Sequence, residues 1–92
     1  MQVTVEYTAQ IRRAAGVSSE SYSVDDGCTV DGLLPQIAER HGNDLGRFLV
    51  TEDGSPQSTL LAFISDSQVR WGNETPLKDG QTVTLLSPIS GG

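Results

Sequence analysis

The sequence contains one segment with the apolar spacing of an α-helix, and segments on both sides of it alternate apolar and polar residues as β-strands do. Apolar residues recur at spacings of three and four, the period of an α-helix that buries one face, at Val30, Leu33, Leu34, Ile37 and Ala38. A single amphipathic helix can bury this stripe against one face of a mixed sheet. We therefore expect an α+β fold in which this helix packs on a sheet formed by the rest of the chain.

The ends of this helix carry recognisable signals. Thr29 or Asp31 can cap its first turn, which places the start near residues 30 to 32, and Gly42 is suited to follow the last turn. Pro35 lacks the N–H that an interior helical position would donate. The proline therefore predicts an irregular second turn.

The strand patterns lie on both sides of the helix. β-Branched and apolar residues alternate or run together, as is typical of strands, over residues 3–8, 21–24, 60–64, 68–71 and 81–87. Residues 14–16 are interpreted as a loop, and residues 43–58 are the least regular part, with one helical turn at Leu45, Phe48 and Leu49. This order predicts a β-grasp domain of the ubiquitin type, with about five strands.

Length and charge restrict the class of protein further. The chain has 92 residues, which indicates one domain, and its net charge of −6 includes only six basic residues. A nucleic-acid surface needs clustered Lys and Arg, so none is expected, and neither is a membrane span. The negative charge favours basic or mixed-charge protein partners. With one cysteine and one histidine, we expect no disulfide, no metal site and a cytoplasmic location.

The C-terminal residues carry the strongest functional signal. The domain is expected to span residues 1–87, followed by a tail of five residues, 88–92, that ends in Gly91 and Gly92. Glycine has no Cβ, so such a backbone can thread a channel too narrow for side chains. Extended at about 3.3 Å per residue, the tail reaches roughly 16 Å. Pro88 either stiffens the exit of this tail or simply terminates the last strand.

These patterns together resemble the ubiquitin-like sulfur-carrier family. The resemblance rests on residues 3–5 and 9–12, on the helix at 29–42, and above all on residues 75–92, which read TPLKDGQTVTLLSPISGG. The family includes the small subunit of molybdopterin synthase, which the chain resembles most, the thiamine sulfur carrier and a carrier for cysteine biosynthesis. Ser87 replaces the first proline of the family's double proline.

The resemblance implies a chemical cycle at Gly92. An E1-like adenylating enzyme, using ATP and magnesium, would activate the Gly92 carboxylate, and a sulfur donor would then convert it to a thiocarboxylate. The large subunit of molybdopterin synthase, or another sulfur-accepting enzyme, would take the sulfur. The chain itself would bind no cofactor and, acting alone, would not be a catalyst. Gly91 would let the backbone pass the partner's channel.

One face of the last strand is expected to dock the partner. Alternation places Val83 and Leu85 on one side and Leu86 on the other. If the first two pack on the helix, Leu86 lies on the open sheet face, beside Pro88, Ile89 and Ser90, and Phe63 extends the same patch. The alternative interpretation of Leu86 is an isolated exposed leucine, which is common.

Two other functions compete with the molybdopterin assignment. The chain could carry sulfur for cysteine or thiamine biosynthesis, or it could be a ubiquitin-like modifier conjugated to other proteins through Gly92. Lys78 is the only lysine, which excludes a linkage-rich polymer of the chain with itself. A third possibility is a β-grasp interaction domain whose tail has no chemical role.

Overall fold

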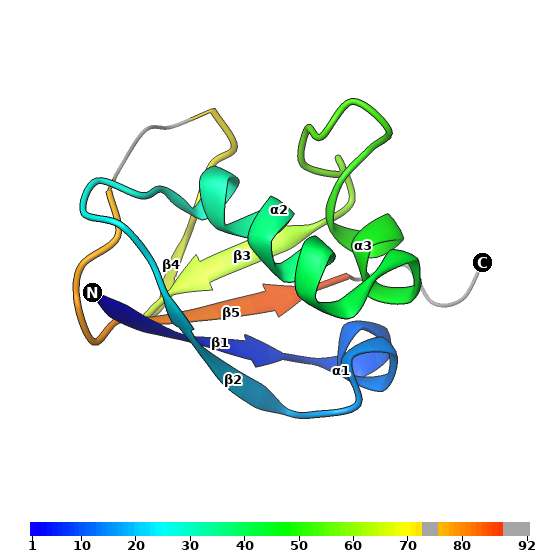
Figure 1. Ribbon diagram of the computed structural model, residues 1–92, viewed down its shortest axis with the longest axis horizontal. Helices are drawn as coiled ribbons and strands as arrows, with labels where there is room; N and C mark the ends of the chain where they lie inside the picture. The colour runs from blue at the N-terminus through cyan, green and yellow to red at the C-terminus, as the bar shows by residue number, and fades with distance from the viewer. Residues whose placement is uncertain (73–75, 88–92) are drawn as a thin grey trace.

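The computed structural model describes residues 1–72 and 76–87. Within these residues the chain forms five strands and three helices (Figure 1). In chain order they are β1 (Gln2–Tyr7), α1 (Ala9–Ala15), β2 (Ser19–Ser23), α2 (Val30–His41), α3 (Asn43–Leu49), β3 (Leu61–Ile64), β4 (Ser67–Gln68) and β5 (Thr82–Leu86).

The described strands form one mixed sheet in the order β2-β1-β5-β3-β4. β1 pairs with β2 in antiparallel fashion and with β5 in parallel, while β3 pairs with β5 and β4 in antiparallel fashion. Helices α2 and α3 lie on one side of this sheet, and α1 lies at the end where β1 and β5 finish (Figure 1). This arrangement confirms the predicted ubiquitin-like β-grasp fold.

The long helix is more regular than its sequence suggests. Thr29 caps α2, because its side-chain oxygen accepts a hydrogen bond from the Gly32 N–H over 3.2 Å. At the other end, the Gly42 N–H donates to the Ala38 carbonyl over 2.8 Å, with φ of 79° at Gly42. The predicted irregular second turn is wrong, since α2 runs unbroken through Pro35. Pro35 is exposed to solvent, and α2 continues without the bond that an N–H at this position would have made.

Helix α1 is missing from the sequence-based interpretation. Residues 14–16 were expected to form a loop, but α1 extends to Ala15 and ends at Gly16, whose φ is 79° and whose N–H donates to the Arg12 carbonyl. Ile11 is the one fully buried residue of α1, so the segment shows no apolar repeat. The alanines and arginines, which have high helix propensity, stabilise this short helix instead.

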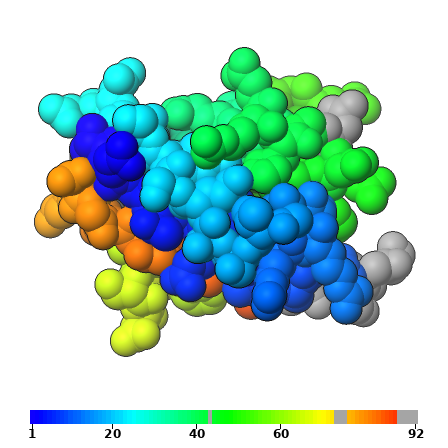
Figure 2. All heavy atoms as spheres, turned by 60° about the horizontal axis from the view of Figure 1, so that its bottom comes forward, coloured from blue at the N-terminus to red at the C-terminus, as the bar shows by residue number. Residues whose placement is uncertain are grey.

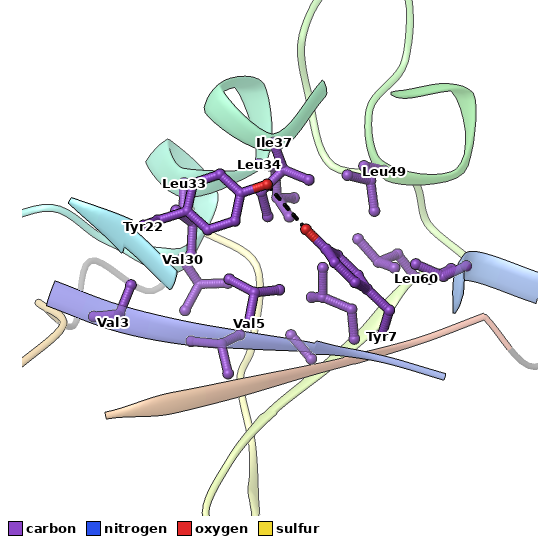
Figure 3. Packing of buried hydrophobic residues seen from close by; sticks show 14 of the residues in the cluster. Val3, Val5, Tyr7, Tyr22, Val30, Leu33, Leu34, Ile37, Leu49 and Leu60 are labelled. Atoms are coloured by element: carbon purple, nitrogen blue, oxygen red, sulfur yellow. Dashed lines mark hydrogen bonds between the residues drawn. The ribbon is translucent and has the colours of Figure 1, made fainter. Parts of the chain in front are cut away.

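The core lies between the helices and the sheet, where β-strand and helix side chains interdigitate (Figure 3). Leu33, Leu34 and Ile37 of α2 are fully buried, as predicted from their spacing, and so are Val83 and Leu85 of β5. Helix α3 packs closely on α2 because Gly46 has no side chain. A Cβ at that position would lie 3.2 Å from the Ala38 Cβ, closer than ordinary packing allows.

Candidate functional site

The strand that leads to the tail is the central strand of the sheet. β5 lies between β1 and β3, with Val5 opposite Val83 and Tyr7 opposite Leu85. Ser87, the residue that follows the strand, is only 8% exposed. The backbone from which the tail departs is therefore fixed on both sides by neighbouring strands.

A side-chain hydrogen bond strengthens this attachment. The Thr8 hydroxyl donates to the Leu85 carbonyl over 2.8 Å. Thr8 precedes α1, but its side chain makes no capping bond to that helix. The hydroxyl thus joins the start of α1 to the end of β5, next to the root of the tail.

The register places a row of half-buried residues on the sheet face opposite α2. Leu61 lies opposite Leu86, and Phe63 lies opposite Thr84. Their neighbours along each strand, Ala62, Val83 and Leu85, are buried or lie under the helices, so this row faces the other way. We call Leu61, Phe63, Thr84 and Leu86 the open-face patch. The predicted facing of Leu86 is confirmed, and Phe63 shares its face.

The remaining predicted site residues lie outside the described residues. They are Pro88, Ile89, Ser90, Gly91 and Gly92. The boundary between a domain at 1–87 and a tail at 88–92 stays a prediction, as do the roles of these five residues.

A polar cluster on the helix side of the sheet could not be predicted from the sequence. Glu20 of β2 accepts three hydrogen bonds at one carboxylate oxygen, Oε2, at distances of 2.7 to 2.8 Å. The donors are the Tyr7 and Tyr22 hydroxyls and His41 Nε2. The two hydroxyl oxygens are also 3.0 Å apart (Figure 3). The cluster links the C-terminal end of α2 to β1 and β2.

Ionisation in this cluster follows from its hydrogen bonds. Partial burial acts to raise the pKa of Glu20, but the bonds from His41, Tyr7 and Tyr22 outweigh it and hold the pKa below its ordinary value. Burial first, and then the contacts among these groups, raise the pKa of Tyr7. Burial is also the main reason why the pKa of Tyr22 is raised. At neutral pH, Glu20 is therefore an ionised carboxylate that accepts hydrogen bonds from the neutral hydroxyls of Tyr7 and Tyr22.

Other chemical groups in the described residues form no second site. No three His, Cys, Asp or Glu side chains within residues 1–72 and 76–87 are arranged to hold a metal ion. Burial, with added repulsion from Asp25, raises the pKa of the Cys28 thiol, which disfavours the reactive thiolate. None of the helices in the same ranges is long and apolar enough to span a membrane.

The fold defines a protein of the ubiquitin-like β-grasp class. It is similar to the crystal structure of SAMP1 from Haloferax volcanii, with a TM-score of 0.85 and 21% sequence identity over 100% of both chains. In sequence, the profile of the ThiS family matches residues 5–92. The chain therefore belongs to the ThiS family, whose members are ubiquitin-like sulfur carriers.

Two curated relatives match along the whole chain. The molybdopterin synthase sulfur carrier subunit of Chlamydomonas reinhardtii is 32% identical over 92 residues, covering 100% of both chains. Small archaeal modifier protein 3 of Haloferax volcanii is 26% identical, again over 100% of both chains. One relative is thus named for sulfur transfer and the other for protein modification.

Proposed function

We propose that this chain is the sulfur carrier of molybdopterin biosynthesis, acting as the small subunit of molybdopterin synthase. The similarity that carries this proposal is the match to the Chlamydomonas reinhardtii carrier subunit, 32% identical from end to end. The structure supports it through the position of β5, the central strand, which leads directly into the sequence that ends in Gly91-Gly92.

The proposed reaction takes place at the Gly92 carboxylate. A carboxylate oxygen attacks the α-phosphorus of ATP on an E1-like enzyme, which forms the acyl-adenylate and releases pyrophosphate. Hydrosulfide then attacks the acyl carbon, AMP leaves with the electrons of the broken C–O bond, and one proton is released. The product is a thiocarboxylate whose sulfur a second enzyme can take. The substrate of that enzyme would be a cyclic pterin phosphate held by the large subunit.

The residues of this chain indicate which part of the reaction it would supply and which part its partner enzymes would supply. In the described residues no nucleophile, base and acid stand together as a self-contained catalytic site, so the chain supplies the reactive carboxylate and its presentation. β5 and the Thr8–Leu85 hydrogen bond would hold the root of the tail while Gly91 and Gly92 enter the partner. The open-face patch would give that partner an apolar anchor next to the tail.

A reconstitution tests the assignment to this pathway. The purified chain is incubated with its adenylating enzyme, MgATP and sulfide, and then added to molybdopterin synthase large subunit loaded with its pterin precursor. Formation of molybdopterin, lost when Gly91 and Gly92 are deleted, is the expected result. Failure of a thiocarboxylated chain to support this step would contradict the molybdopterin assignment and leave carriage of sulfur to another acceptor.

A protein-modifier function is the second candidate, and the match to small archaeal modifier protein 3 favours it. The same adenylated carboxylate would then be attacked by the amino group of a target lysine, with AMP as the leaving group and an isopeptide bond as the product. Immunoblots of the native host would show higher-mass species that depend on Gly92. Their absence would argue against this candidate.

A further inference from the structure

Half of the basic residues gather at one end of this acidic protein. The chain has six Lys and Arg residues, and three of them are exposed on two neighbouring short helices, Arg12 and Arg13 on α1 and Arg47 on α3. The two helices are in contact, and Figure 2 shows the blue atoms of α1 beside the green atoms of α3. We call these three arginines the basic end surface.

The arginines line surface hollows. Arg13 and Arg47 border one hollow between α1 and α3, together with Gln10, Phe48 and one acidic residue, Asp44. Arg12 and Arg13 border a second hollow on α1, next to Val17, whose side chain is 41% exposed. The surface therefore combines positive charge with exposed apolar atoms, a combination suited to contact with another protein.

Within the described part of the chain, none of the three guanidinium groups forms a salt bridge, although Asp44 borders the same hollow as Arg13 and Arg47. Among residues 1–72 and 76–87, the one salt bridge joins His41 to Glu20, and the arginines of the basic end surface are not part of it. The Arg47 guanidinium instead lies 5.4 Å from the centre of the Phe48 ring. Their charge is thus directed outward, although the chain as a whole carries a net charge of −6.

The basic end surface lies at the end of the sheet from which the tail departs. β1 and β5 run parallel and finish together, with Tyr7 opposite Leu85, and α1 starts two residues after Tyr7. The Thr8–Leu85 hydrogen bond fixes this neighbourhood. Because residues 88–92 follow directly from this end of β5, a protein that receives them would bind close to these arginines.

We propose that the basic end surface docks against an acidic surface of the protein that adenylates the tail. This inference rests on the proposed function, because it takes the tail as the group that the partner must receive. It also refines an expectation drawn from composition. The net negative charge favours basic or mixed-charge partners, and the local positive charge of the basic end surface complements carboxylates on such a partner.

Single charge reversals test the docking surface. Arg13→Glu and Arg47→Glu each take the net charge from −6 to −8, because one positive charge is replaced by one negative charge. Lys78→Glu makes the same change of charge in the turn that precedes β5, at the opposite end of that strand, so it is the matched control. The assay is ATP–pyrophosphate exchange by the adenylating enzyme at increasing concentrations of the carrier.

We expect the two arginine reversals to raise the KM for the carrier about fivefold or more at low salt, with kcat nearly unchanged. High salt should shrink this difference, because screening weakens contacts between exposed charges. Lys78→Glu should change KM less than about twofold. Thermal unfolding of each variant checks the fold, and if a reversal unfolds the protein, Arg13→Gln, Arg47→Gln and Lys78→Gln give the same comparison.

The outcomes separate this inference from the proposed function. Equal KM values for the arginine variants, the lysine control and the unaltered chain would overturn the docking surface while leaving adenylation of Gly92 intact. An equal rise in all three variants would also overturn it, since only total charge would then matter. Absence of exchange with the unaltered chain would overturn the proposed function and the docking inference together.

Discussion

The Thr8 hydroxyl donates a hydrogen bond to the Leu85 carbonyl, and this 2.8 Å contact links the residue before α1 to the C-terminal end of β5. Seventy-seven positions separate the two residues in the chain. The contact helps to hold the end of β5, from which we propose that the tail extends into another protein.

Loss of this hydroxyl should weaken the fold at the root of the tail. Thr8→Val keeps the shape of the side chain but leaves the part-buried Leu85 carbonyl without that donor, so we expect a loss of about 1–2 kcal/mol in the free energy of unfolding. Urea denaturation measures the change. Thr8→Ser retains the hydroxyl and is the control, and equal stability of the valine and serine variants would contradict the role of the bond.

The Glu20 cluster should make stability depend on acid pH. The pKa of Glu20 is lowered in the folded protein from an ordinary value of 4.5. A lowered pKa contributes stability that is fully present above the ordinary value and is lost as the pH falls through the folded-state pKa. Protonation of Glu20 should therefore loosen the link between α2 and the β1–β2 pair in acid.

Glu20→Gln isolates this contribution. At about pH 7 we expect the variant to be less stable by roughly 1–2 kcal/mol, at the low end for hydrogen bonds to a charged group because solvent partly screens Glu20. This difference should shrink as the pH falls from 4.5 toward about 3. Chemical denaturation at both pH values gives the comparison. Glu6→Gln, at an exposed position of β1, is the control. A deficit that persists undiminished in acid would show that the ionised carboxylate is not responsible.

The open-face patch should matter for binding more than for folding. Phe63→Ala and Leu86→Ala remove half-buried apolar atoms from the sheet face, so we expect affinity for the partner that takes the tail to fall about tenfold or more. Calorimetric or surface-based titration with that partner measures it. Thr82→Ala, on the same face at the other end of β5, should bind normally. Unchanged affinity in both apolar variants would place the interface elsewhere.

A side chain at Gly91 should block the chemistry without disturbing the domain. Gly91→Val adds a β-branched side chain where the proposed channel admits only backbone, and we expect adenylation to drop about a hundredfold. The readout is pyrophosphate exchange, with thermal unfolding as the check on folding. Ser67→Ala, at an exposed position of β4, is the control, and it should retain the activity. Normal turnover of the valine variant would refute the narrow-channel account.

The elements that bury a repeating apolar pattern could be predicted from the sequence. Spacings of three and four identified α2, and alternation placed Val83 and Leu85 in the core. Helix α1 was missed because Ile11 is its single buried anchor, so no period is visible. The irregular turn at Pro35 was predicted from the local effect of proline alone. The buried face of α2 packs on the sheet, and this tertiary packing keeps the helix continuous.

The site was predictable in part for a similar reason. The face of the sheet on which a side chain lies follows from the alternation of residues along its own strand. Leu86 could therefore be placed on the open sheet face from the sequence. In the Glu20 cluster, the partners of Glu20 come from β1, β2 and α2 and lie 2 to 21 positions away from it in the chain. The basic end surface joins α1 to α3. Such groupings depend on how elements pack, and single-sequence periodicity carries no information about that.

The mass of the intact protein isolated from its native host under gentle, non-alkylating conditions tests the central claim most directly. The account predicts a species heavier by the exchange of one oxygen for one sulfur, located by fragmentation at Gly92. It also predicts that this species disappears when the adenylating enzyme is deleted. An unmodified carboxylate in the presence of that enzyme, with sulfide available, would contradict the sulfur-carrier function.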